Sequence, residues 1–333
     1  MNKVPFFSVV IPTYNRSFYL IECLESVLAQ TFEDFEVIIV DDGSNDDTGD
    51  LVKPYLSEKV HYIFQENKGV GCARNQGIKT SRGKYVAFLD SDNIWLTNHL
   101  QKYYEIIMER GIENVPVLHC NYRCFDEHGN LLPSDGEPLN GWVIKDLMRG
   151  TKVCINSIVV RRDALERVQF DEDRRMGVSA DWEFVIRLSA RYPLTYHPQI
   201  SVLMRKHEEQ MMADLGAISK SKMITLERIF ANEELLPLIK PYRGLAYAHG
   251  CLVIGIINYE KGNMAEARSC IKKAMEHYPQ IIFSPKALGL FAKTLLGRTL
   301  SKKGRELKRV IRSYFLKRIN DSKKPHKGSL HLK

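Results

Sequence analysis

The 333-residue chain has no apolar run that approaches the ~18 residues needed to cross a bilayer. Its seven cysteines are an odd number and include no Cys-x-x-Cys pair, so neither a disulfide framework nor a zinc ribbon is predicted. The apolar segment 6–12 is too short for the core of a signal peptide and predicts a first strand instead. From these absences we expect a protein of the reducing cytoplasm that meets a membrane only from its cytoplasmic side.

The positive charge of the chain is concentrated at its C-terminal end. The formal net charge is +8, but residues 301–333 contain 12 Lys and Arg against two acids, which leaves about −2 for residues 1–300. Attraction to polyanions is therefore expected only from this tail. Apolar residues there follow one helical stripe among many cations: Leu307, Val310, Ile311, Phe315 and Leu316. Such helices lie on anionic membrane surfaces, and the alternative is a basic tail without a target. No aromatic–basic motif supports nucleic-acid binding.

Strands and helices alternate through the first hundred residues. Apolar runs predict strands at 6–11, 35–40, 60–64 and 85–89. One helix is predicted to begin after Ser17, which is its N-cap, and further helices are predicted at 47–55, 72–79 and 98–110. This order is typical of βαβ units, hence of an α/β fold with a mostly parallel, right-handed, Rossmann-like sheet. Strands at 117–125, 155–160 and 194–204 are expected to extend the sheet, and a further helix is expected from Ser179.

After about residue 216 only helices are predicted. Small residues and breakers recur at the spacing of a 34-residue tetratricopeptide unit, namely Gly255, Gly262, Ala267, Ala274 and Pro279. One unit is too few for an independent solenoid, so this hairpin is expected to pack on another surface. We predict a catalytic domain at 1–215, a helical tetratricopeptide-like region at 216–282 and a basic amphipathic tail at 283–333.

Two of the predicted buried strands end in a close pair of carboxylates. Asp41 and Asp42 follow one strand, and Asp90 and Asp92 follow another. In an open α/β sheet the ligand crevice lies outside the carboxyl ends of the strands, so both pairs are expected to face one pocket. Acid pairs repel unless a cation or a hydrogen-bond donor lies between them. The pattern therefore favours a nucleotide and a divalent metal.

Five short motifs in the chain together resemble those of family 2 glycosyltransferases of the GT-A fold. They are VVIPTYNR at 9–16, QTF at 30–32, VDDGS at 40–44, ARN at 73–75 and LDSD at 89–92. The resemblance is strong over residues 6–97 and looser over 98–210. It implies an inverting sugar transfer from a nucleotide-diphosphate donor, a UDP-sugar by preference, assisted by Mg²⁺ or Mn²⁺. The acceptor it implies is a glycan, a polysaccharide of the cell envelope or a lipid-linked sugar.

The resemblance places the donor against five residues at the start of the domain. Pro12 and Tyr14 are expected to shape the base pocket, and Asp42 to contact the base with Asp41 beside it. Arg74 either pairs with the diphosphate or holds the loop after Gly69. The alternative for the two aspartates is that they cap the turn that follows them.

The later motif positions carry the implied chemistry. Asp90 is expected to contact the donor ribose or sugar, and Asp92 to bind the metal, with His207 as a further ligand. Asp181 is expected to be the general base, although Ala180 stands where the family usually has an acid, and a simple N-cap is the alternative. Arg205 together with His207 would close over the diphosphate.

Two tryptophans are candidates for contact with the acceptor, and two other functions remain open. Trp95 and Trp182 are placed on the acceptor side by the resemblance, but core packing is the preferred interpretation of Trp95. A nucleotidyltransferase would also place acids near a nucleotide, but residues 12–14 do not form a glycine-rich phosphate loop. The other alternative is a catalytically decayed adaptor that retains sugar-nucleotide binding.

Overall fold

The computed structural model describes residues 4–132, 136–150, 152–207 and 215–295. The chain divides into two compact units, residues 1–250 and 251–333. The predicted boundaries at 215 and 282 stay predictions, and most of the predicted tail, residues 296–333, lies outside the described residues. No helix in the described ranges combines the length and the apolar character that a bilayer span requires.

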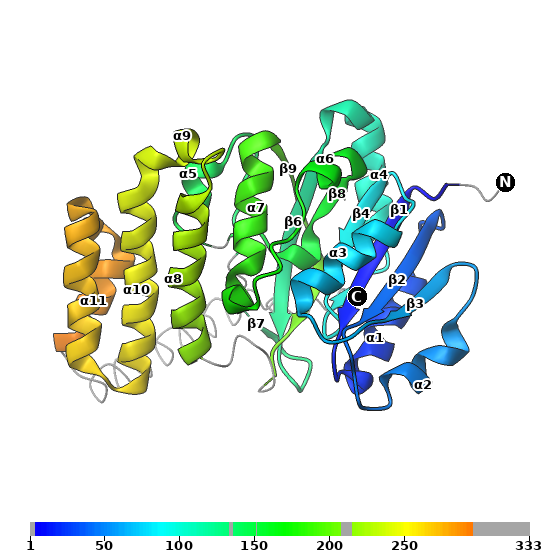
Figure 1. Ribbon diagram of the computed structural model, residues 1–333, viewed down its shortest axis with the longest axis horizontal. Helices are drawn as coiled ribbons and strands as arrows, with labels where there is room; N and C mark the ends of the chain where they lie inside the picture. Colours follow the sequence, from blue (N-terminus) through cyan, green and yellow to red (C-terminus); the bar gives the residue numbers. More distant parts are fainter. Residues whose placement is uncertain (1–3, 133–135, 151, 208–214, 296–333) are drawn as a thin grey trace, which may run out of the picture. The chain divides into compact units, whose positions relative to one another are not determined.

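One mixed sheet forms the centre of the first unit (Figure 1). Its strands are β1 (Phe7–Thr13), β2 (Phe35–Asp41), β3 (Val60–Phe64), β4 (Tyr85–Phe88), β5 (Ile94–Trp95), β6 (Val117–Phe125), β7 (Leu131–Leu132), β8 (Val159–Arg161) and β9 (Leu194–Arg205). The order is β3-β2-β1-β4-β8-β6-β9-β5, with β7 paired to β6. Strands β1 to β4 are parallel, as predicted, whereas β8 joins β4 and β6 antiparallel and β9 returns parallel to β6.

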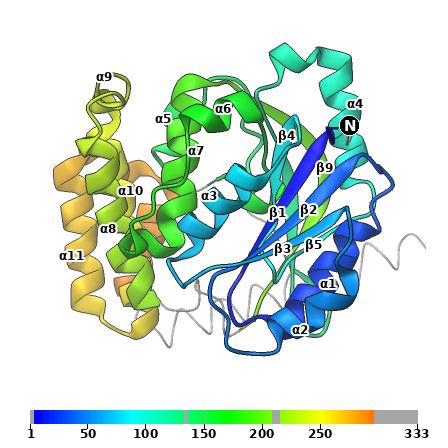
Figure 2. The ribbon, with the colours of Figure 1, turned by 45° about the vertical axis from the view of Figure 1, so that its right-hand side comes forward.

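The helices of the first unit lie on both faces of this sheet, except the last two, which pack on other helices (Figure 2). They are α1 (Ser17–Leu28), α2 (Thr48–Val52), α3 (Val70–Thr80), α4 (His99–Arg110), α5 (Ile144–Leu147), α6 (Arg162–Arg167), α7 (Ala180–Arg191), α8 (Leu215–Ala231) and α9 (Leu236–Ile239). Every residue of β1 and β2 is buried, as expected for parallel strands covered on both sides. Gly77 lets α3 approach the sheet, because a Cβ there would lie 2.3 Å from Cγ1 of Val10.

Two local predictions differ from the structure. Arg16, not Ser17, is the N-cap of α1, because Asn15 adopts a positive φ of 49° and bonds to the 44–45 turn through its backbone N–H and side chain. The predicted strand 155–160 begins only at Val159, since residues Ile155–Ser157 form a 3-10 turn.

The predicted helical hairpin is present near the C-terminus. It consists of α10 (Arg243–Lys261) and α11 (Met264–His277), and a short helix follows at 285–295. A Cβ at Gly255 would lie 3.1 Å from Cβ of Cys270 on α11, so the small residue allows the two helices to pack closely.

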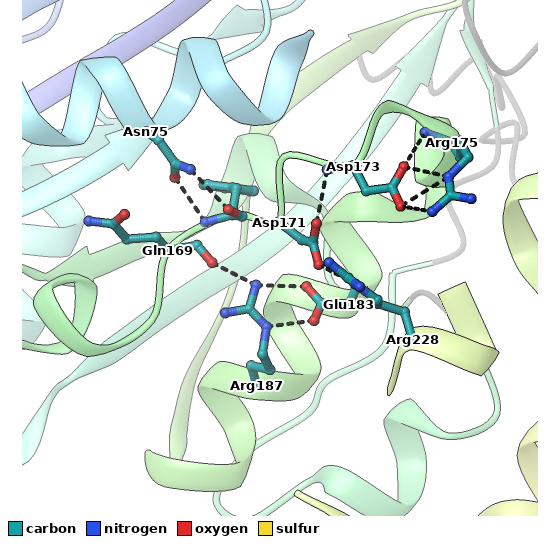
Figure 3. Close-up of polar contacts among 9 residues, drawn as sticks. Asn75, Gln169, Asp171, Asp173, Arg175, Glu183, Arg187 and Arg228 are labelled. Atoms are coloured by element: carbon teal, nitrogen blue, oxygen red, sulfur yellow. Dashed lines mark hydrogen bonds and ion pairs between the residues drawn. The ribbon is translucent and has the colours of Figure 1, made fainter. Parts of the chain in front are cut away.

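The segment 168–175 connects α3 to α7 and α8 through side-chain hydrogen bonds (Figure 3). Asn75 on α3 donates to the carbonyl of Phe170 and to Glu172, both at 2.9 Å, and accepts from the N–H of Phe170 at 2.9 Å. Arg187 on α7 donates to the carbonyl of Gln169 and forms an ion pair with Glu183, while Arg228 on α8 donates to Asp171. One asparagine therefore fixes the backbone of this segment against α3.

We expect Asn75→Asp to lower the free energy of unfolding by about 1–3 kcal/mol. A carboxylate cannot donate to the Phe170 carbonyl, and it would repel Glu172. Urea denaturation measures the change, and Gln76→Glu is the matched control, because its side-chain amide bonds to no described residue. Equal losses in the two variants would show that the Asn75 hydrogen bonds do not stabilise the fold.

Candidate active site

The carboxyl ends of three adjacent parallel strands, β2, β1 and β4, meet at one edge of the sheet. Asp42 follows β2, Tyr14 follows β1, and Asp90 and Asp92 follow β4. The side chain of Tyr14 is exposed, whereas Pro12 is buried within β1. This edge is where the open α/β fold leaves room for a ligand.

The two aspartates at the end of β2 are buried and hydrogen-bonded within the protein. Asp41 accepts from the hydroxyl of Tyr62 at 2.6 Å and from the N–H of Ser44 at 2.7 Å. Asp42 accepts from the backbone N–H groups of Lys68 at 2.9 Å and Gly69 at 2.7 Å, and from the Gln65 side chain at 2.7 Å. Asp41 thus holds the turn that follows it, and Asp42 orders the loop that leads into α3.

Arg74 joins two acidic residues that are far apart in the sequence. Its guanidinium, from α3, donates through Nη2 to Oδ1 of Asp90 at 2.7 Å and through Nη1 to Oδ1 of Asp181 at 2.5 Å. The Arg74 side chain is 3% exposed, and it also lies 5.1 Å from the ring centroid of Phe170. In the structure the arginine is a buried cation shared by two carboxylates, and its predicted pairing with a diphosphate stays a prediction.

Asp181 lies in the first turn of α7, where its carboxylate points at Arg74. Ser179, not Asp181, occupies the N-cap position of this helix. Only Oδ1 of Asp181 bonds to Arg74, and within the described chain Oδ2 has no hydrogen-bond partner. Burial raises the pKa of the Asp181 carboxyl, and Arg74 opposes that shift while the Asp90 charge adds to it. The group is therefore a carboxylate with one oxygen held and one oxygen available.

Asn156 is a further member of the cluster that the sequence did not indicate. It donates to Oδ2 of Asp90 at 3.1 Å and accepts from the Asp90 backbone N–H at 2.5 Å. Its own carbonyl accepts from the indole of Trp95 at 2.8 Å. Asp90 is thus fixed by an arginine on one oxygen and an amide on the other.

Asp92, Arg205 and His207 form a second group beside this cluster. Nε2 of His207 lies 3.2 Å from Oδ2 of Asp92, and Arg205 donates to the Asp92 carbonyl at 3.3 Å and forms an ion pair with Glu22. Burial and the nearby Asp90 charge raise the pKa of the Asp92 carboxyl, while His207 lowers it.

Asp92 and His207 could supply only some of the ligands of a divalent cation. Among the described residues no cluster of three or more His, Cys, Asp or Glu is arranged around one point. Mg²⁺ at a nucleotide takes one or two carboxylates from the protein and the rest from phosphate and water. One carboxylate and one imidazole within hydrogen-bonding distance satisfy that need, so Asp92 and His207 are compatible with a nucleotide-bound metal.

The two tryptophans lie away from any ligand-facing surface. Trp95 is 2% exposed and stacks on His99 with ring centroids 4.2 Å apart. Trp182 is 1% exposed, donates to the carbonyl of Leu147 at 2.7 Å and is covered by Lys222. The structure agrees with the preferred interpretation of Trp95 as a core residue, and the acceptor contact expected of Trp182 is corrected, because its ring also packs inside the protein.

Comparison with known proteins gives consistent matches over the same part of the chain. The family model for glycosyl transferase family 2 matches residues 8–155. A putative teichuronic acid biosynthesis glycosyltransferase, TuaG of Bacillus subtilis, is 32% identical over an alignment of 192 residues that covers 54% of this chain and 72% of that protein. An uncharacterized glycosyltransferase of Rickettsia bellii is 36% identical over 172 residues, which are 51% of this chain but only 24% of that protein.

Solved structures share the fold at lower identity. Staphylococcus aureus TarS 1–349 in complex with UDP-GlcNAc aligns with a TM-score of 0.53 and 19% identity, covering 82% of this chain and 89% of that one. The mannosyltransferase PcManGT of Pyrobaculum calidifontis, in complex with GDP-Man and Mn²⁺, aligns with a TM-score of 0.56 and 18% identity, covering 90% and 83%. With more than two thirds of the Bacillus relative covered at 32% identity, the chain belongs to family 2 of the glycosyltransferases, and its fold is of GT-A type.

Proposed function

We propose that the protein transfers a sugar from a nucleotide-diphosphate donor to a hydroxyl group of a glycan, a polysaccharide or a lipid-linked acceptor, with inversion at the anomeric carbon. The observation that carries this proposal is the Arg74 bridge, which holds Asp181 beside Asp90 at the ligand edge of the sheet. The solved relatives contain UDP-GlcNAc or GDP-Man, which supports a sugar nucleotide as the ligand.

The donor base and ribose are assigned to the ends of β1 and β2 and to the loop that Asp42 orders. Tyr14 offers an exposed ring on which a base can stack. Asp42 keeps the 65–69 loop in place, and a carboxylate has about four acceptor sites, so its three bonds leave room for a donor contact. We favour a uridine diphosphate sugar, with Asp90 contacting its ribose or sugar.

Asp181 is assigned the role of general base. An inverting transfer needs a group that removes the proton from the attacking hydroxyl, and Oδ2 of Asp181 is available to accept it. Arg74 fixes the orientation of the carboxylate through Oδ1, so the proton is received at one defined atom. Only the ionised carboxylate can accept a proton, and burial raises the pKa of Asp181. Turnover should therefore rise as the pH increases through that pKa.

Asp92 and His207 are the residues that would hold a divalent metal. Bound there with the donor, Mg²⁺ or Mn²⁺ would stabilise the negative charge of the departing diphosphate as a Lewis acid. Arg205 is assigned to the same diphosphate, since it already contacts the Asp92 backbone.

We place the protein at the cytoplasmic face of a membrane, where lipid-linked acceptors are available. The supporting feature is the local charge of +10 in residues 301–333, which an anionic leaflet attracts at about 1 kcal/mol for each nearby Lys or Arg. This contact would be electrostatic and therefore weakened by salt.

A panel of sugar nucleotides tests the donor and metal assignments. We expect one of UDP-GlcNAc, UDP-glucose and GDP-mannose, with Mn²⁺ or Mg²⁺, to stabilise the protein by about 2.7 kcal/mol at a hundredfold excess over its Kd, as measured by thermal shift. Asp92→Asn should remove the metal-dependent part of this stabilisation, whereas the surface variant Asp146→Asn should retain it. Stabilisation by no sugar nucleotide would contradict the proposed function.

Asp181→Asn separates catalysis from donor binding. The amide oxygen can still accept from Arg74, so donor affinity should stay unchanged, while release of nucleoside diphosphate should fall by ~10²–10⁴. Isothermal titration and a product-release assay measure the two quantities on the same preparation. Comparable losses of affinity and turnover would instead assign Asp181 a purely structural role as the partner of Arg74.

A further inference from the structure

The helix at 285–295, in the second unit, buries one face and exposes an apolar stripe on the other. Ala287, Leu290 and Thr294 are buried, and Leu290 lies against Gly255 of the hairpin. Leu288, Phe291 and Leu295, at helical spacing of three and four, are 50%, 42% and 66% exposed. Nothing in the described part of the unit covers these three side chains.

The stripe continues into a groove on α11. The groove has a volume of about 380 Å³, and its apolar lining residues are Phe291, Ile271 and Met275. Three charged residues, Arg268, Lys272 and Glu276, complete the lining. The surface formed by the stripe and the groove is here called the α11 face.

The charge around the α11 face is positive. Residues 251–295 contain six Lys and Arg against three Glu, so their net charge is +3. Lys286 and Lys293 are exposed on the side of the helix opposite the stripe, and Arg268 and Lys272 line the groove beside it. Their charge disfavours both a second copy and the chain's own +10 tail as the partner, and it favours an anionic one.

We propose that the α11 face inserts into the surface of an anionic bilayer, with Leu288, Phe291 and Leu295 in the acyl boundary and with Arg268 and Lys272 among the headgroups. This inference rests on the membrane partner proposed above, but it assigns part of the contact to the folded residues 268–295 and not to residues 301–333 alone. A helix with an apolar stripe and flanking Lys and Arg binds bilayers in this way.

The two contributions to membrane binding differ in their response to salt. Attraction between the tail and anionic lipid is screened as ionic strength rises, whereas burial of apolar side chains is not. Binding that persists at high salt should therefore depend on the α11 face.

Co-sedimentation of the full chain with phosphatidylglycerol-containing vesicles, at low and high salt, tests the inference. We expect the double variant Phe291→Ser/Leu295→Ser to lose at least about tenfold in vesicle affinity at both salt concentrations, since each lost side chain removes apolar burial. The matched control is Leu51→Ser/Leu238→Ser, which changes two leucines of the first unit with 43% and 52% exposure. Deletion of residues 301–333 should remove mainly the salt-sensitive part.

Unchanged vesicle affinity in the Phe291/Leu295 variant would overturn the inference. If affinity is unchanged but sedimentation velocity shows a smaller species than wild type, the α11 face is an interface between copies. If wild type binds no vesicles but pulls an acidic protein from solution, the partner is a protein and the inference also fails. The sugar nucleotide should stabilise wild type and all these variants equally. Absence of that stabilisation would count against the proposed function and not against the α11 face.

Discussion

The site depends on the pairing of one buried arginine with two carboxylates from distant parts of the chain. Without Arg74, Asp90 and Asp181 would be two acids in a partly buried place with no cation between them, and one of them would tend to protonate. Without the carboxylates, a guanidinium that is 3% exposed would be buried with its charge unpaired, which costs several kcal/mol. The pairing is therefore a condition for both the local fold and the ionisation of the proposed base.

The scaffold around Arg74 explains how this pairing is held in place. The neighbouring Asn75 fixes the backbone of Phe170, whose ring stacks on Phe184 of α7 with centroids 3.8 Å apart. Asp42 orders the loop at the start of the same helix α3 through the N–H of Gly69. Helix α3 thus links the loop assigned to the nucleotide with the helix that carries Asp181.

The sequence predicted those parts of the structure that depend on local pattern. The four parallel strands, the carboxylate pairs at one edge of the sheet and the C-terminal helical hairpin follow from periodicity and motif spacing, and the structure confirms them. Contacts across 66 to 107 residues could not be found in this way. The sequence carries no signal for the Arg74 bridge or for Asn156, and it does not reveal that the Trp182 ring packs inside the protein. The antiparallel direction of β8 could not be predicted either, because a short apolar run does not encode strand direction.

The pH dependence of nucleoside diphosphate release, compared between wild type, Arg74→Lys and Arg74→Met, tests the central claim most directly. The base must be ionised to act, and the Arg74 charge lowers the pKa of Asp181 against the effect of burial. Removing that charge raises the pKa, so the acidic limb of the profile should move to higher pH in Arg74→Met and stay close to wild type in Arg74→Lys. An acidic limb that does not move in Arg74→Met, in a protein that still folds and binds donor, would contradict the claim that Arg74 controls the ionisation of Asp181.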